Sequence, residues 1–146
     1  MKYPKISILV PAYNEEAVIG KTLHHLINEI KYPNKEIIVG DDGSTDRTKK
    51  IAEEFARKYP RLVFVDSSSR LGVAGRMYRL LKRAHGKIIV KNDAEMMFHD
   101  PKHVFFKIVE CFKDPKVGGI ACFSEDFSKT GEAKKSLITR GELFAN

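Results

Sequence analysis

Five acidic side chains follow short apolar segments of this chain, in positions where they could act together. They are Glu15, Asp41, Asp42, Asp93 and Glu95. Carboxylates held in one crevice repel one another and raise each other's pKa. Because a divalent cation or a set of hydrogen-bond donors relieves that repulsion, the pattern predicts a site for a cation or a polar ligand wherever the fold brings these residues together.

The apolar segments alternate with helical patterns, and this alternation predicts how the acidic residues are positioned. We expect strands at residues 6–10, 36–40, 62–65, 88–90 and 117–123, and helices at about 16–29, from Ser44 or Thr45 to 59, after Gly72 to 84, and from Pro101 onward. Such alternation is typical of an α/β fold with a mostly parallel, Rossmann-like sheet and helices on both faces. Ligands of these sheets bind beyond the carboxyl ends of the strands, where the acidic residues lie.

The composition is that of one ordinary globular domain. The chain has 146 residues, of which 42% are hydrophobic and 31% charged, and this length is enough for a single buried core. No stretch reaches the roughly 18 apolar residues of a spanning helix. The first apolar run, residues 6–10, is too short for the core of a signal peptide. We therefore expect a cytoplasmic protein.

The net charge of +7 is consistent with an anionic partner, such as a nucleotide or an acidic membrane surface, or with solubility alone. The basic residues are scattered and do not form a stripe interleaved with aromatic residues, so we expect no nucleic-acid binding. His24 and His25 are adjacent on a predicted helix and are expected at the surface rather than at a metal.

Three motifs together resemble family 2 glycosyltransferases of the GT-A type. Residues 11–15 (PAYNE) follow the first strand and are similar to the opening motif of that family. Residues 39–48 (VGDDGSTDRT) are similar to its second motif almost letter for letter. Residues 93–95 (Asp-Ala-Glu) fall where the family carries its Asp-x-Asp metal motif. The order and the spacing of all three motifs agree with the family.

The resemblance implies a GT-A fold that binds a nucleoside-diphosphate sugar, with UDP- and GDP-sugars both open. Its implied nucleotide-sugar-binding residues are Pro11, Ala12, Tyr13, Glu15, Asp42, Arg70, Asp93 and Ala94. Asp93 and Glu95 would hold Mg²⁺ or Mn²⁺, with the substrate completing the coordination. The implied reaction is an inverting, metal-dependent sugar transfer to a lipid, a polyprenyl phosphate or a saccharide, with the inner face of the membrane as one alternative location.

The chain departs from the family pattern in three respects. The metal motif ends in Glu95 rather than Asp, and Tyr78 stands where the family often has Asn. No residue after Glu95 forms a convincing acceptor-activating base, although Asp126 and Glu142 are candidates by type. We therefore expect residues 1–146 to be one donor-binding domain that lacks part of the acceptor-binding half. A non-catalytic nucleotide-binding or scaffold module, or a fragment of a larger enzyme, stays as the alternative.

Overall fold

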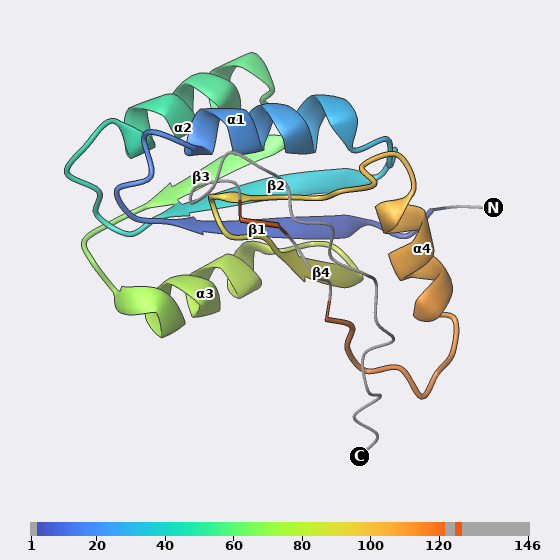
Figure 1. Ribbon diagram of the computed structural model, residues 1–146. Coiled ribbons are helices and arrows are strands. Elements are labelled where there is room, and N and C mark those ends of the chain that lie inside the picture. Colours follow the sequence, from blue (N-terminus) through green and yellow to red (C-terminus); the bar gives the residue numbers. More distant parts are fainter. Residues whose placement is uncertain (1–2, 122–124, 127–146) are drawn as a thin grey trace.

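The computed structural model describes residues 3–121 and 125–126. Its centre is a four-stranded sheet in which every neighbouring pair is parallel, with strand order β3-β2-β1-β4 (Figure 1). The strands are β1 (Ile6–Ala12), β2 (Lys35–Asp41), β3 (Val63–Ser67) and β4 (Ile88–Lys91). The parallel sheet expected from the alternation of strands and helices is therefore confirmed.

The two central strands are buried because helices cover both faces of the sheet. β1 and β2 are nearly continuous runs of buried residues, as parallel strands covered on both sides require. Ile8 of β1 lies in register with Ile37 of β2 and with Val90 of β4. All four strands therefore end at the same edge of the sheet.

The helices divide unequally between the two faces (Figure 1). The helix α1 (Ile19–His24), the π-helical turn η1 (His25–Glu29) and the helix α2 (Thr48–Lys58) lie on one face. The helix α3 (Gly72–Arg83) lies on the other face, and α4 (Val104–Cys111) packs near the end of the sheet from which the strands start. A pair of two-residue strands, β5 (Met96–Met97) and β6 (Glu125–Asp126), forms a separate antiparallel ladder.

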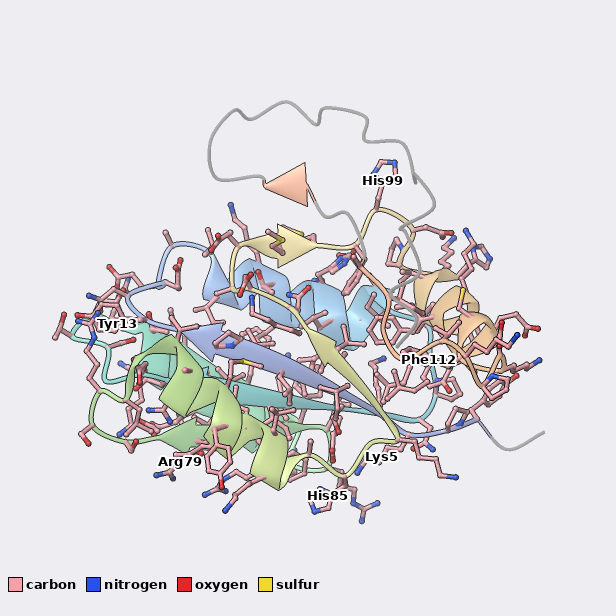
Figure 2. The ribbon with its side chains drawn as sticks, turned by 90° about the horizontal axis from the view of Figure 1, so that it is seen from below. Lys5, Tyr13, Arg79, His85, His99 and Phe112 are labelled. Atoms are coloured by element: carbon pink, nitrogen blue, oxygen red, sulfur yellow. The ribbon has the colours of Figure 1, made fainter. Side chains whose placement is uncertain are left out.

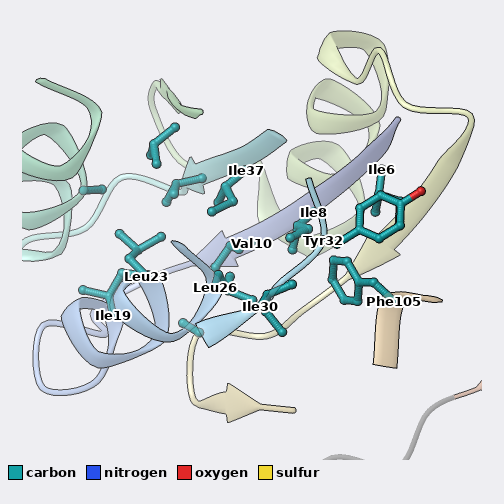
Figure 3. Packing of buried hydrophobic residues seen from close by; sticks show 14 of the residues in the cluster. Ile6, Ile8, Val10, Ile19, Leu23, Leu26, Ile30, Tyr32, Ile37 and Phe105 are labelled. Carbon is teal, nitrogen blue, oxygen red and sulfur yellow. The ribbon is translucent and has the colours of Figure 1, made fainter. Parts of the chain in front are cut away.

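The main core lies between the sheet and α1 (Figure 3). Leu23 and Leu26 from the helical side pack with Ile8 and Val10 of β1, and all four are fully buried. Aromatic rings close the end of this core near α4: Tyr32 and Phe105 meet edge to face, with ring centroids 6.1 Å apart. A smaller core of Leu9, Ile38 and Leu80 lies under α3.

Several sequence-based expectations are wrong in detail. Residues 117–121 form no strand, and the rest of that expected strand lies outside the described residues. α2 begins at Thr48 rather than after Ser44 or Thr45, since the Asp46 carboxylate accepts hydrogen bonds from the amide (2.9 Å) and hydroxyl (2.6 Å) of Thr48.

His25 is buried rather than exposed, with 3% of its surface accessible. Its burial follows from a hydrogen bond to a distant loop, which helical spacing alone does not reveal. The side chain of Asp126 and all of Glu142, the two candidate acceptor bases, lie outside the described part of the chain.

Candidate functional site

A pocket of about 200 Å³ opens at the carboxyl ends of β1, β2 and β4. Its lining residues are Pro11, Ala12, Tyr13, Glu15, Asp42, Val73, Arg76, Asp93, Ala94 and Glu95. The structure thus brings together every residue that the sequence suggested for a nucleotide-sugar site except Arg70, which lies beside the pocket on the Tyr13 ring. Parallel strands produce this convergence because their loops emerge at one edge.

Asp42 is the most heavily hydrogen-bonded carboxylate of the pocket. The backbone amides of Leu71 and Gly72, at the start of α3, donate to its two oxygens at 2.7 and 3.0 Å. The buried guanidinium of Arg76 donates to Oδ1 at 3.3 and 3.4 Å. Burial by itself raises the pKa of Asp42, but the two amides and Arg76 more than offset it and hold the pKa below its ordinary value. Asp42 is therefore an anion that fixes α3 against β2.

Asp41, the neighbouring carboxylate, has a structural role. Its oxygens accept hydrogen bonds from the amide of Ser44 (3.2 Å) and the hydroxyl of Ser67 (2.9 Å), and it does not line the pocket. These bonds hold the turn that contains Gly43, whose φ of 76° favours glycine. Of these two neighbours, only Asp42, which the resemblance implied as a binding residue, lines the pocket.

The loops after β1 and β2 are joined by reciprocal hydrogen bonds. The amide of Asn14 donates to the Ser44 hydroxyl (3.0 Å), and the amide of Thr45 donates to Oδ1 of Asn14 (2.9 Å). Asn14 has a φ of 53°, a left-handed conformation that asparagine tolerates better than most residues. The Glu15 amide donates to the Thr48 hydroxyl (2.7 Å). These bonds set the position of Tyr13 and Glu15 at the pocket wall.

Tyr13 and Arg70 form one wall of the site from two different loops. The Arg70 guanidinium carbon lies 4.0 Å from the centre of the Tyr13 ring, a cation–π contact. Tyr13 remains 36% exposed, so part of its ring faces solvent. Figure 2 shows Tyr13 at the extreme end of the molecule, beside the start of α3. A flat aromatic surface with a cation attached suits a nucleobase or a phosphate.

The acidic side of the pocket combines Glu15, Asp93 and Glu95. Burial raises the pKa of Glu15, and the negative charges of Glu95, Asp46 and Asp93 raise it further. Glu15 of the loop after β1 and Asp93 and Glu95 of the loop after β4 line the same pocket, so carboxylates of the two loops share it. No described cation pairs with the carboxylates of Glu15 or Glu95, whereas Lys91 binds both oxygens of Asp93 at 2.6 and 2.7 Å.

The loop that carries Asp93 and Glu95 is anchored from α1 and η1. The Thr22 hydroxyl donates to the carbonyl of Ala94, and the amide of Phe98 donates to Nε2 of His25 at 3.0 Å. Nε2 therefore accepts, which leaves the proton on Nδ1, 2.9 Å from Glu29. Buried Asn92 closes the turn by donating to the carbonyl of Met96 (3.1 Å). The loop is thus held at several points along its length.

The oxygen ligands of this site fit a hard divalent cation, which prefers carboxylate and phosphate oxygens. Asp93 and Glu95 lie together on the pocket wall and would hold such a cation, with Glu15 nearby. Within residues 3–121 and 125–126, however, no three His, Cys, Asp or Glu side chains are arranged to hold a metal ion by themselves. A cation at Asp93 and Glu95 would need further ligands, which the oxygens of a bound diphosphate can supply.

Three residues at or beside the pocket were not singled out by the sequence analysis: Val73, Arg76 and Lys91. Val73 and Arg76 line the pocket from α3, and Lys91 neutralises Asp93. The helical pattern of the sequence does not reveal that Arg76 is buried at the pocket, where only 1% of its surface is accessible. The one available signal for Lys91 was a charged residue at the end of an apolar strand, two positions before an acidic residue.

The chain belongs to glycosyl transferase family 2, whose model matches residues 7–143. It is 33% identical over 144 residues to a beta-monoglucosyldiacylglycerol synthase of Nostoc sp.. The alignment covers 96% of this chain and 29% of that protein. The chain therefore spans less than a third of the length of this curated relative.

Solved structures of glycosyltransferases share the fold. A mannosyltransferase from Pyrobaculum calidifontis, in complex with GDP-Man and Mn²⁺, superposes with a TM-score of 0.73 at 28% identity, covering 84% of this chain and 36% of that one. Glucosyl-3-phosphoglycerate synthase from Mycobacterium tuberculosis, with Mn²⁺ and UDP, gives a TM-score of 0.62 at 25% identity over 78% of this chain and 42% of that one. The expected GT-A fold is thus confirmed.

Proposed function

We propose that this chain is the donor-binding part of a metal-dependent glycosyltransferase that transfers a sugar from a nucleoside-diphosphate sugar. The observation that carries the proposal is the single pocket that joins Tyr13, Asp42, Asp93 and Glu95 at the ends of three parallel strands. The structural relatives bind GDP-Man or UDP with Mn²⁺, which supports a UDP- or GDP-sugar as donor and Mn²⁺ or Mg²⁺ as the cation.

The pocket residues divide the donor between two sides. The Tyr13 ring, with Arg70 stacked on it, would receive the base and ribose, and Pro11 and Ala12 would line the floor beneath them. Asp93, Ala94 and Glu95 on the β4 side would face the diphosphate. Asp42 would accept a hydrogen bond from the base through a lone pair that its α3 partners leave free.

A divalent cation at Asp93 and Glu95 would stabilise the negative charge that develops on the leaving diphosphate. The chain itself would orient the donor so that an acceptor hydroxyl attacks the anomeric carbon from the opposite side. That attack needs a base, and none of the described residues after Glu95 lines the pocket. We therefore propose that the acceptor half of the site lies outside the described part of the chain.

The acceptor and the location follow from the same proposal. The Nostoc relative is named for a diacylglycerol product, which supports a lipid acceptor, while a polyprenyl phosphate and a saccharide stay open as acceptors. Within the described residues, no helix has the length and apolarity needed to cross a membrane. We propose that the protein works on the cytoplasmic side, at the inner face of a membrane.

Calorimetric titration of UDP, GDP, CDP and ADP, each with Mn²⁺ and with EDTA, tests the proposal. Binding of one diphosphate that depends on Mn²⁺ is the expected result and identifies the base. If none of the four binds in either condition, the chain lacks a competent donor site and the proposal is wrong. Binding without turnover or hydrolysis of the matching sugar conjugate would favour the alternative of a non-catalytic nucleotide-binding module.

A further inference from the structure

The helix α3 has an unusual charge pattern for a surface helix. It contains Arg76, Arg79, Lys82 and Arg83 and no Asp or Glu, although the chain as a whole has 19 acidic residues. Arg76 is buried at the donor pocket, while the other three reach solvent. α3 is the only long helix seen on its face of the sheet among the described residues (Figure 1). Its outer side is therefore cationic, and no other described helix covers it.

Exposed apolar side chains gather on the same side of the molecule. Six large hydrophobic residues with more than a third of their surface accessible lie on α3 or on the sheet face beneath it: Phe64, Leu71, Val73, Tyr78, Leu81 and Ile89. Phe64 is in register with buried Ile38. Ile89 is in register with Ser7, which lies on the same face of β1 as Leu9 because the two are two positions apart. Since Leu9 and Ile38 pack under Leu80 of α3, the register places both exposed side chains on the α3 face.

The spacing on α3 turns this group into a stripe. Leu71, Ala74, Tyr78 and Leu81 follow one another at intervals of three and four residues, and all four are exposed. Helical geometry places residues at these intervals on one side of the helix, away from buried Leu80. Lys82 lies beside the stripe, with Nζ 4.8 Å from the centre of the Tyr78 ring. We call the exposed residues of α3 with Ile89 the α3 surface.

The acidic groups near this surface are already neutralised. Asp66, which is 2% exposed, pairs with Arg79 (2.8 Å), Arg83 (3.2 Å) and Arg76 (3.7 Å). One carboxylate thus faces three guanidinium groups, and the excess is positive. Glu36 is likewise buried, where it binds Lys5 and the amide of His85. The surface retains a net positive charge with no exposed acidic residue on α3 to oppose it.

The edge of the sheet formed by β4 also carries apolar and basic residues. A pocket of about 520 Å³ lies beside β4, and apolar side chains of β4 and α4, with Phe98, line it together with Lys87 and Lys91. The register places Lys91 opposite Leu9, so the lysine emerges on the α3 side of the strand. Apolar side chains and Lys87 therefore extend from α3 to β4, whereas the charge of Lys91 is paired with Asp93. None of the described residues that line this pocket is acidic.

We propose that the α3 surface docks this protein on a bilayer of anionic phospholipid. Exposed Leu and Tyr side chains flanked by Lys and Arg are the combination that binds the headgroup region, where apolar burial and attraction to anionic lipids add together. A nucleic-acid backbone would use the cations but would give the apolar stripe of Tyr78 and Leu81 no favourable environment. The combined chemistry favours the bilayer.

The position of α3 gives the docking a consequence for the pocket. Val73 and Arg76, near the start of the helix, line the donor site, so a bilayer against α3 would lie close to the pocket mouth. This part of the inference rests on the proposed function, since it would bring a lipid acceptor to the sugar donor. The docking itself depends only on the surface.

Co-sedimentation of the whole chain with vesicles tests the inference. We expect binding to vesicles of phosphatidylglycerol and phosphatidylcholine, weaker binding in high salt, and little binding to phosphatidylcholine alone. Lys82→Glu should lower the partition coefficient about tenfold or more. Each cation near an anionic surface raises this coefficient about fivefold, and the charge reversal removes one cation and adds a repelled anion. Tyr78→Ser with Leu81→Ser should lower it as well, and these exposed positions should leave folding intact.

The matched control is Lys50→Glu, which makes the same charge change at an exposed position of α2 on the opposite face. If the wild-type chain does not bind anionic vesicles, or if Lys50→Glu and Lys82→Glu lower binding equally, the α3 surface is not the docking site and the inference is wrong. Calorimetry with nucleoside diphosphates in solution, on the same variants, keeps the two proposals separate. Loss of vesicle binding with nucleotide binding retained is the expected pattern.

Discussion

The ammonium of Lys91 lies 2.6 and 2.7 Å from the two carboxylate oxygens of Asp93. Lys91 ends β4, and Asp93 stands two residues later on the wall of the donor pocket. The ammonium of Lys91 therefore occupies the carboxylate of Asp93, which is the group that the proposed metal cation would use as a ligand. Because both side chains are partly exposed, the pair is weak enough to exchange. We therefore expect a cation that binds Asp93 to compete with Lys91.

Replacing Lys91 by Met should therefore strengthen metal binding in the absence of nucleotide. An exposed ion pair contributes at most about 1 kcal/mol, so we expect the Kd for Mn²⁺ to fall by roughly two- to fivefold, measured by the electron paramagnetic resonance signal of free Mn²⁺. Lys87→Met, which removes the same charge just before the start of β4, is the control. Equal effects of the two substitutions would mean that only net charge matters and that the pair does not compete with the metal.

Glu95→Gln should remove most of the Mn²⁺ dependence of diphosphate binding. The amide keeps the shape of the side chain but is a poor ligand for a divalent cation, so the ratio of the Kd values in EDTA and in Mn²⁺ should fall about tenfold or more towards one. Calorimetry measures both values. Glu16→Gln serves as the control because that exposed carboxylate binds Arg47 instead of lining the pocket. A ratio unchanged from wild type would exclude Glu95 as a ligand.

Asp42→Asn should lower stability at neutral pH, because it leaves the buried Arg76 guanidinium without its full counter-charge. Removing one partner of a buried pair costs on the order of 3 kcal/mol, and urea unfolding at pH 7 measures it. The pKa of Asp42 is depressed in the folded protein, so its charge stabilises the fold above the unfolded value of 3.8. That contribution is lost as the pH falls through the folded pKa.

The difference between wild type and Asp42→Asn should therefore shrink as the pH is lowered below about 4. A difference that stayed constant with pH would show that the charge of Asp42 is not what holds α3. Asp42 thus has a structural role besides any contact with a nucleobase. A loss of nucleotide affinity in an Asp42 variant identifies a base contact only if the variant is shown to be folded.

Tyr13→Phe should retain nucleotide binding, whereas Tyr13→Ala should weaken it about fivefold. The ring supplies the stacking surface and the partner for Arg70, a contact of roughly 1 kcal/mol, while the Tyr13 hydroxyl makes no hydrogen bond with the residues that the structure describes. Fluorescence or calorimetric titration with the preferred diphosphate separates the two variants. If Tyr13→Phe loses as much affinity as Tyr13→Ala, the hydroxyl and not the ring makes the contact.

Gly40→Ala should destabilise the fold by roughly 1–3 kcal/mol, as overpacking of a core does. A Cβ at this position of β2 would lie 2.6 Å from Cδ of Arg76 and 2.9 Å from each methyl of Leu80. The melting temperature should fall accordingly. At Gly118 a Cβ meets no heavy atom within 4 Å, so Gly118→Ala should leave the melting temperature nearly unchanged.

The sequence predicted the elements with strong periodicity and the loops that meet at the strand ends. It gave Pro11, Asp42 and Glu95 as neighbours because parallel strands bring their carboxyl ends to one edge. Contacts between residues that are far apart in the sequence could not be predicted from it. The burial of His25 depends on the amide of Phe98, and the burial of Arg76 depends on Asp42 and the absence of a side chain at Gly40. Neither relation is visible in the local pattern.

The strand order also determines when the donor pocket can form during folding. β1 pairs with β2, which follows it along the chain after one helical segment, but its other neighbour is β4, so that Ile6 lies opposite Ile88. Closing the longer loop costs more conformational entropy and is slower. We expect β1, β2 and β3 to associate before β4 joins them. The Tyr13 side of the pocket would then exist in a folding intermediate that has no metal side, and binding of a nucleoside without phosphate would begin earlier in refolding than binding of the metal–diphosphate complex.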